Sequence, residues 1–179
     1  MTPIFLIVGA PATGKSTASR ALAAQFPKSI AIGVDDLRSM VVSGLIHPSA
    51  AWSAELTEQL HLARQSATAM ALHYHAAGYA VIIDDFWDPQ TQMNEYSKLF
   101  VQTAVQRVLL YPNEQKAHDQ NLQRSGPGPL QAYLDEGIKI VYADLENVVS
   151  DLARQGWHVL DTTTDTVAET VARLYTIAV

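Results

Sequence analysis

The stretch Gly9-Ala10-Pro11-Ala12-Thr13-Gly14-Lys15-Ser16 decides the fold. It matches the pattern G-x-x-x-x-G-K-[ST] at every specified position, directly after the apolar run Ile4–Val8 and before an alanine-rich helical pattern. Glycines let the backbone turn so that successive N–H groups point into one concavity, and a helix N-terminus adds partial positive charge there. The spacing therefore predicts a phosphate-binding loop between a strand and a helix.

Each part of this loop has an expected partner on a nucleotide. Lys15 can reach the β- and γ-phosphates, and the Ser16 hydroxyl can hold Mg²⁺. We therefore predict ATP and Mg²⁺ as ligands, with Lys15 as a catalytic residue as well. The residues expected to bind the nucleotide are those of the loop and the start of the helix: Gly9, Ala10, Pro11, Ala12, Thr13, Gly14, Lys15, Ser16 and Thr17.

Further along the chain, apolar runs alternate with helical patterns. The runs are continuous and rich in β-branched residues, as in parallel strands covered on both faces, and they occupy 4–8, 30–34, 80–83, 105–110 and 158–160. Helical patterns occupy 15–25, 50–77, 91–103, 114–124, 131–154 (with a break expected near Gly137) and 166–177. This alternation predicts βαβ units in a doubly wound α/β sheet.

Composition limits the classes of function. The 179 residues carry 12 Lys and Arg against 18 Asp and Glu, a net charge of −6, and 48% of them are hydrophobic, which fits one folded domain over residues 1–179. The absence of cysteine excludes disulfides, thiolate zinc sites and cysteine nucleophiles. The longest apolar run at the N-terminus has only five residues, so we expect a cytoplasmic protein with no membrane partner. The sequence does not predict an oligomeric state.

Two predicted strands end in pairs of aspartates. The first pair lies in Val34-Asp35-Asp36-Leu37-Arg38, where strand ends face the ligand crevice of a doubly wound sheet. We predict that Asp35 is a general base that accepts the proton of an attacking hydroxyl. Arg38 lies one helical turn later on the same face and is the candidate to hold an anionic group of the acceptor. Either aspartate can alternatively serve only as a helix N-cap.

The second pair follows Ile82-Ile83 and consists of Asp84 and Asp85. An apolar strand that ends in Asp is typical of a carboxylate that holds Mg²⁺ directly or through water. Because neighbouring residues in a strand alternate sides, only one of the two faces the metal. We predict Asp85 as the metal residue together with Ser16, with Asp84 as the alternative.

Together, residues 9–16, 34–38 and 83–85 resemble the P-loop kinase family. The kinase domain of polynucleotide 5′-hydroxyl kinases is nearest in pattern, and chloramphenicol phosphotransferase, zeta-toxin and gluconate-kinase-type enzymes are looser relatives. The resemblance implies a three-layer αβα P-loop NTPase fold with a five-stranded parallel sheet and a helical lid, here at about 113–137. It also implies that the Asp after the second strand is the general base and that the Arg three residues later binds the acceptor.

In this family the lid supplies arginine to the transferring phosphoryl group, typically from an R-N-x-x-R-like stretch. The corresponding stretch here is Gln120-Asn121-Leu122-Gln123-Arg124. Arg124 matches the second arginine and is our catalytic candidate, whereas Gln120 stands in place of the first. This departure leaves Arg107 and Arg154 as alternative sources of the arginine.

Three functions are compatible with these residues. The favoured one is an ATP-dependent kinase, an enzyme that transfers the γ-phosphoryl group to a hydroxyl of a small molecule. ATP is preferred because the guanine-reading motif N-K-x-D is absent. The alternatives are a polynucleotide 5′-hydroxyl kinase, less favoured because a chain at −6 has no evident basic track, and a non-catalytic nucleotide-binding module.

Connecting segments predict where the two substrates lie. Residues 41–52 are expected to overhang the acceptor pocket, and Asp161–Thr164 are expected near the adenine. Trp52, Phe86 and Trp87 either line an aromatic acceptor site or belong to the core.

Overall fold

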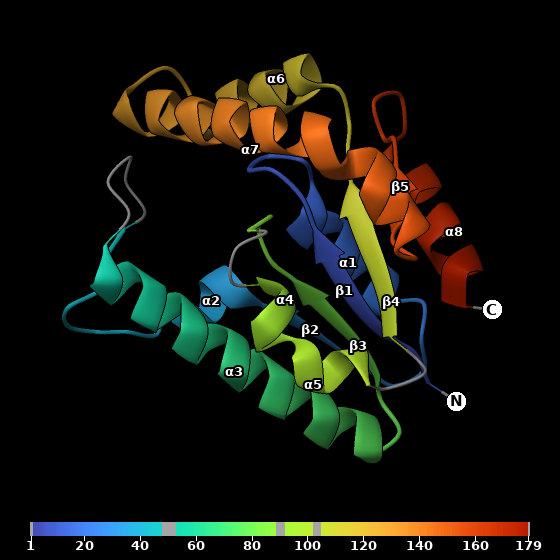
Figure 1. Cartoon of the computed structure of the whole chain (residues 1–179). Coiled ribbons are helices and arrows are strands. Elements are labelled where there is room, and N and C mark those ends of the chain that lie inside the picture. The colour runs from blue at the N-terminus through green and yellow to red at the C-terminus, as the bar shows by residue number, and fades with distance from the viewer. Residues whose placement is uncertain (1, 48–52, 89–91, 102–104, 179) are drawn as a thin grey trace.

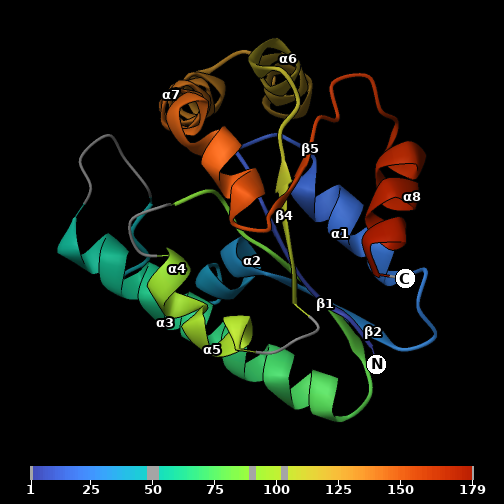
Figure 2. The same ribbon diagram turned by 45° about the vertical axis from the view of Figure 1, so that its right-hand side comes forward.

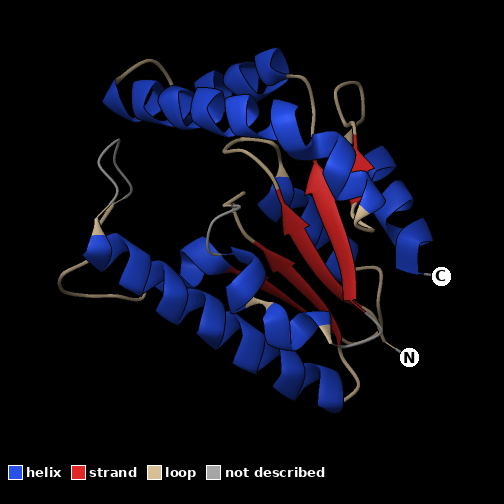
Figure 3. Cartoon of the chain, in the orientation of Figure 1, coloured by secondary structure: helices blue, strands red, loops and turns tan. Residues whose placement is uncertain are grey.

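A computed structural model of the chain describes residues 2–47, 53–88, 92–101 and 105–178. Its centre is a five-stranded sheet in the order β2-β3-β1-β4-β5, with every pair parallel (Figure 3). The strands are β1 (Ile4–Val8), β2 (Ser29–Gly33), β3 (Ala80–Asp84), β4 (Val105–Leu110) and β5 (His158–Leu160). The predicted α/β fold with a five-stranded parallel sheet is confirmed.

Helices cover both faces of this sheet. They are α1 (Lys15–Ala23), α2 (Val34–Arg38), α3 (Ala54–Ala76), α4 (Gln92–Glu95), α5 (Ser97–Phe100), α6 (Glu114–Ser125), α7 (Pro129–Arg154) and α8 (Val167–Ala178). Because successive strand residues point to opposite faces, Phe5 packs with Leu22 of α1 and Leu174 of α8, whereas Leu6 packs on the side of Ala67 of α3. Figure 2 shows α1 and α8 on one side of the sheet and α3 on the other.

The helices α6 and α7 form an antiparallel hairpin beyond the carboxyl ends of the strands (Figure 1). The predicted break near Gly137 is wrong, since α7 runs unbroken over 26 residues. One glycine inside a helix costs about 1 kcal/mol, which the packing of so long a helix outweighs. At this glycine α7 passes the phosphate loop, where an added Cβ would lie 3.5 Å from Pro11 Cγ.

Two other helical predictions differ from the structure. The pattern at 91–103 forms two short helices, α4 and α5, on either side of the buried Tyr96. The long helix α3 begins at Ala54, where the Ser53 side chain accepts a hydrogen bond from the Leu56 N–H. None of the helices in the described ranges is long and apolar enough to cross a membrane.

Candidate active site

The phosphate loop, residues 9–16, joins β1 to α1 at the carboxyl end of the sheet. Gly14 caps α1 in a left-handed conformation with φ 83°, and Ala12 is also left-handed at φ 59°. Gly9 lies so close to β4 that an added Cβ would be 2.6 Å from the carbonyl oxygen of Leu110. The two glycines of the motif thus serve the turn and the close approach that a phosphate cradle needs.

The charges of the other predicted catalytic groups, Asp35 and Arg124, act on Lys15. Its ammonium group donates a 2.7 Å hydrogen bond to the carbonyl oxygen of Ala10 within the loop. Burial lowers the pKa of Lys15, the carboxylates of Asp35, Asp84 and Asp85 oppose that change, and the charge of Arg124 adds to it. The fold therefore brings Lys15, Asp35 and Arg124, from three separate parts of the chain, into one electrostatic site.

At the end of β3 the structure favours Asp84 over the predicted Asp85. The Ser16 hydroxyl donates a 2.7 Å hydrogen bond to Asp84 Oδ1, so these two groups form one cluster of oxygen atoms beside the phosphate loop. Burial raises the pKa of Asp84, although the Ser16 hydrogen bond and the charge of Lys15 oppose this change. Our sequence prediction chose the wrong member of the pair for contact with Ser16.

Asp85 points to the opposite face of the sheet, toward α3. Its Oδ2 accepts hydrogen bonds from Arg64 Nε at 2.7 Å and from the Tyr96 hydroxyl at 3.1 Å. Arg64 Nη1 also donates to Asp88 at 2.9 Å and to Glu95 at 3.1 Å. Burial alone would lower the pKa of Arg64, but the charge and hydrogen bond of Asp85, the hydrogen bond to Asp88 and the effect of Tyr96 together raise that pKa. Sequence analysis missed Arg64.

The aspartates after β2 are exposed and lie at the start of α2. Asp35 Oδ1 lies 3.5 Å from Arg38 Nη1, and the Asp35 side chain is 78% exposed. Asp36 points instead to Arg20 of α1, with 3.0 Å between Oδ2 and Nη2. Of this pair, Asp35 is the one whose charge acts on Lys15.

Arg38 is nearly buried, with only 7% of its side chain exposed. Its Nη2 donates a 2.7 Å hydrogen bond to the carbonyl oxygen of Ile46, which ties α2 to the segment that follows it. Its buried Nε has no hydrogen-bond partner among the described residues. Arg38 is thus the buried partner of the exposed Asp35, and its Nε–H is a donor without a partner among the described residues.

Tyr133, on the second turn of α7, is a site residue that sequence analysis missed. Burial and the Asp35 carboxylate raise the pKa of its phenol, and the charge of Arg38 opposes that change. Tyr133 precedes Gly137 by one turn, so both lie on the face of α7 that passes Pro11. The charges of Asp35 and Arg38 therefore reach this phenol of α7.

The lid hairpin carries the arginine candidates. Arg124 is exposed near the end of α6, and its charge acts on Lys15. The alternatives are engaged elsewhere, because Arg107 donates to the carbonyl oxygen of Gln155 and Arg154 pairs with Asp151.

The polar residue between the two arginine positions has a structural role. Asn121 is fully buried, and its amide donates to the Gln131 carbonyl oxygen at 2.9 Å and to Asp135 at 2.8 Å. It joins α6 to α7.

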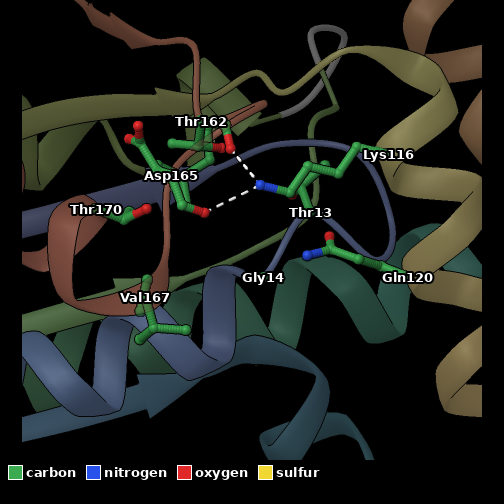
Figure 4. Close-up of a pocket in the computed structure, with 10 residues that line it drawn as sticks. Thr13, Gly14, Lys116, Gln120, Thr162, Asp165, Val167 and Thr170 are labelled. Carbon is green, nitrogen blue, oxygen red and sulfur yellow. Dashed lines mark hydrogen bonds between the residues drawn. The ribbon is translucent and has the colours of Figure 1, made fainter.

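A narrow cavity lies beside the phosphate loop, where the adenine loop was predicted (Figure 4). Thr13 and Gly14 line one side, and Thr162 and Asp165 line another. Lys116 of α6 donates to the carbonyl oxygens of both Thr162 and Asp165, which fixes the loop after β5 to the lid.

Gln120 completes this cavity from α6, and its Oε1 is buried without a hydrogen-bond partner in the described residues. The residue in place of the family's first lid arginine therefore faces the predicted nucleobase side.

Of the two alternatives for the aromatic residues, the structure places Trp87 in the core. Trp87 is 4% exposed and packs edge-on against Trp157 in the core, with 5.9 Å between ring centroids. The guanidinium of Arg64 lies over the Phe86 ring, with 5.1 Å between Arg64 Cζ and the ring centroid. Trp52 lies outside the described residues, as does part of the segment 41–52.

The donor set of Ser16 and Asp84 fits Mg²⁺. This ion prefers oxygen ligands and is usually held by one or two protein groups, with substrate phosphates and water completing its coordination. No group of three or more His, Cys, Asp or Glu within the described ranges is placed to hold a metal by itself. The residues suit an ion that arrives with a nucleotide.

Comparison with known proteins identifies the family. A family model described as an AAA domain matches residues 4–129, well over half of the chain. The chain belongs to that family, a family of P-loop kinases. The resemblance seen in the sequence is thereby confirmed. No curated protein matches the sequence.

Solved structures share the fold over nearly the whole chain. A sugar kinase from Janibacter sp. HTCC2649 superposes with a TM-score of 0.67 at 15% identity, covering 98% of this chain and 94% of that one. The tunicamycin resistance protein of Deinococcus radiodurans gives 0.62 at 14% identity, with 98% and 95% covered. Shikimate kinase from Acinetobacter baumannii in complex with shikimate gives 0.62 at 14% identity, with 99% and 93% covered. At these identities the likeness concerns the fold.

Proposed function

We propose that this protein is an ATP-dependent kinase that phosphorylates a hydroxyl group of a small molecule. One observation carries the proposal: a well-exposed carboxylate, that of Asp35, acts on the same Lys15 that the phosphate loop presents. A protein that only binds nucleotide has no need of an accessible base at this place. Two similar structures, named as kinases of a sugar and of shikimate, also act on small molecules.

The proposed reaction transfers the γ-phosphoryl group of ATP to the oxygen of the acceptor hydroxyl. The acceptor oxygen forms a bond to the γ-phosphorus, the bond between that phosphorus and the β–γ bridging oxygen breaks, and ADP leaves. Asp35 accepts the proton of the acceptor hydroxyl. Lys15 and Arg124 offset the charge on the transferring group and the leaving phosphate, as cationic groups do in related chemistry.

Other residues hold the reactants in place. Ser16 and Asp84 would hold Mg²⁺, which neutralises phosphate charge when bound. Arg38 pairs with Asp35, and the charges of both act on Tyr133, so we assign Arg38 and Tyr133 to the binding of the acceptor. The cavity between Thr13 and Thr162 is the proposed place of the adenine. We propose that the α6–α7 hairpin, which carries Arg124, is the lid.

The decisive experiment is a transfer assay with γ-labelled ATP. The panel contains sugars, cyclic alcohols, amphipathic alcohols and an oligonucleotide with a free 5′-hydroxyl, each with the wild type and with Asp35→Asn. We expect label on at least one small molecule, lost in the variant.

The alternatives give different results. Label on the oligonucleotide alone, with binding that weakens steeply as salt rises, would make the protein a polynucleotide kinase. ATP binding with every acceptor inert would leave a nucleotide-binding module and refute the kinase proposal.

A further inference from the structure

The buried guanidinium of Arg64 joins three parts of the structure around the end of β3. It lies on α3 with none of its side chain exposed, and it contacts Asp85, Asp88 and Glu95. These carboxylates are themselves at most 8% exposed. A buried ion cluster of this kind costs desolvation free energy, and well-packed apolar side chains often serve stability as well or better. Stability alone therefore does not account for its presence.

The geometry of β3 links this cluster to the phosphate site. Ile82 packs with the helices α1 and α8, and Ile83 packs on the side of α3. The same alternation places Asp84 toward α1, where it accepts the hydrogen bond of Ser16, and Asp85 toward α3, where it meets Arg64. The two aspartates are consecutive, so fixing one carboxylate fixes the backbone that carries the other.

Asp85 is held at both of its oxygen atoms. Oδ2 accepts from Arg64 Nε and from the Tyr96 hydroxyl, while Oδ1 accepts a 2.8 Å hydrogen bond from the Phe86 N–H. The backbone N–H of Asp85 also donates to the carbonyl oxygen of Ile7 in β1, at 3.1 Å. The strand end beside the phosphate loop is thereby fixed on both sides of the sheet.

We infer that Arg64 is a positioning residue for the magnesium site: by holding Asp85 toward α3, it keeps the Asp84 carboxylate directed at Ser16 and at the ion that accompanies the nucleotide. This inference rests on the proposed function, because it presumes a nucleotide bound with Mg²⁺. Arg64 touches neither nucleotide nor metal. It acts through Asp85 and the backbone of the strand end, as outer groups do when they orient metal-binding residues.

The test measures how strongly Mg²⁺ tightens nucleotide binding, with a non-hydrolysable ATP analogue as the probe. The dissociation constant is measured by calorimetry in EDTA and in MgCl₂, and the ratio of the two is the readout. For Arg64→Lys, which keeps the charge but not the geometry, we expect this ratio to fall about 10-fold, as for outer groups of other metal sites. The constant in EDTA should stay at the wild-type value.

Two further variants separate positioning from stability. Tyr96→Phe removes one hydrogen bond to Asp85 without burying an unpaired charge, so it decides the matter if Arg64→Lys does not fold. It should lower the ratio in the same direction. Leu60→Ala, one turn before Arg64 on α3 and 1% exposed in the wild type, destabilises the same helix without removing a contact to Asp85. It should keep the wild-type ratio.

The outcomes distinguish this inference from the proposed function. A wild-type ratio in both Arg64→Lys and Tyr96→Phe overturns the inference and leaves the kinase proposal intact. Equal weakening in EDTA and in MgCl₂ across all three variants also overturns it, since that pattern reports general loss of structure. A wild type whose binding does not tighten with Mg²⁺ refutes the metal site itself, and this inference falls with it.

Discussion

The two pairs of aspartates, one after β2 and one after β3, have the same sequence pattern and opposite surroundings. In each pair one carboxylate points to α1: Asp36 to Arg20, and Asp84 to Ser16. The other aspartate of each pair has very different surroundings. The Asp85 side chain is completely buried against Arg64, whereas the Asp35 side chain is 78% exposed beside Arg38. Identical residues at equivalent strand ends therefore receive different tasks from the helices around them.

The difference separates a fixed half of the site from an accessible half. Asp85 accepts three hydrogen bonds from the described residues, so it has little capacity left for a reactant. Asp35 has a single ion-pair contact at 3.5 Å among the described residues, and its exposure allows an acceptor to approach. Under the proposed function, the nucleotide side is thus prearranged, and the acceptor side is open to solvent.

Lys15 is where the two halves meet, so replacing it should have the largest effect. Lys15→Ala removes the cation on which Asp35, Asp84 and Asp85 all act. We expect phosphoryl transfer to fall by about 10³-fold or more, since the loss exceeds that of one donor to a developing anion. Transfer of label from ATP and calorimetric ATP affinity measure it. Lys139→Ala, an exposed lysine on α7, is the control, and a Lys15→Ala variant with wild-type turnover would refute the phosphate site.

The next effect tests the exposed pair. Asp35→Asn keeps the size of the side chain but cannot accept the acceptor proton, so kcat should fall about 10²–10⁴-fold. ATP affinity should not fall, because the variant removes a negative charge near Lys15 and leaves the phosphate loop itself unchanged. Initial rates at saturating ATP and acceptor measure it.

Asp36→Asn is the matched control for that variant, because the neighbouring side chain is also mostly exposed, at 63%. Asp36→Asn should lower kcat only slightly. Equal losses in the two variants would mean that the acidity of α2, and not one base, matters.

The buried pair is tested by Asp84→Asn. The amide keeps a hydrogen-bond acceptor for Ser16 but loses the charge that would hold Mg²⁺. We expect about a 10²-fold loss of transfer rate and a higher Mg²⁺ concentration for half-maximal rate, at the low end for a charge-stabilising group. A Mg²⁺ titration of the rate measures both.

Asp85→Asn should differ from Asp84→Asn by its loss of stability, which is expected in addition to the weaker Mg²⁺ coupling that follows when Asp85 no longer holds the strand end. Arg64 loses its closest carboxylate but keeps Asp88 and Glu95 as partners, so urea unfolding should show a loss of about 1–3 kcal/mol. If Asp84→Asn lost only stability and Asp85→Asn altered the Mg²⁺ titration, the assignment of the two residues would be reversed.

Local spacing explains what the sequence could predict. The phosphate loop needs certain residue types at fixed separations within residues 9–16, and the buried strands need continuous apolar runs. Both can therefore be recognised in the sequence before the fold is known. Lys15 is predicted from the loop pattern and Asp35 from its place after a predicted strand, and the roles of both stay predictions. The unbroken α7 was not predicted, because a glycine ends a helix only where tertiary packing does not stabilise the helix across it.

The choice between Asp84 and Asp85 depended on which sheet face α1 covers, and that is a property of the whole fold. One signal was available: Arg64 stands among Leu60, Ala63 and Ala67 on the buried stripe of a helical pattern, and a buried arginine requires a carboxylate on the facing strand. Tyr133 had no such signal, because its neighbours come from α2, far away in the chain.

The smallest effect concerns this tyrosine and tests whether the open half is completed by the lid. The charges of Asp35 and Arg38 act on Tyr133, so Tyr133→Ala should raise the acceptor KM about 2–10-fold, the value of one hydrogen bond or a comparable contact, without changing the KM for ATP. Tyr133→Phe separates the hydroxyl from the ring. Tyr175→Ala, at 41% exposure against 40% for Tyr133, removes an equally exposed ring from α8 and should change neither constant. If Tyr133→Ala raised the KM for ATP instead, α7 would belong to the nucleotide half, and the acceptor side would be formed by α2 and its neighbours alone.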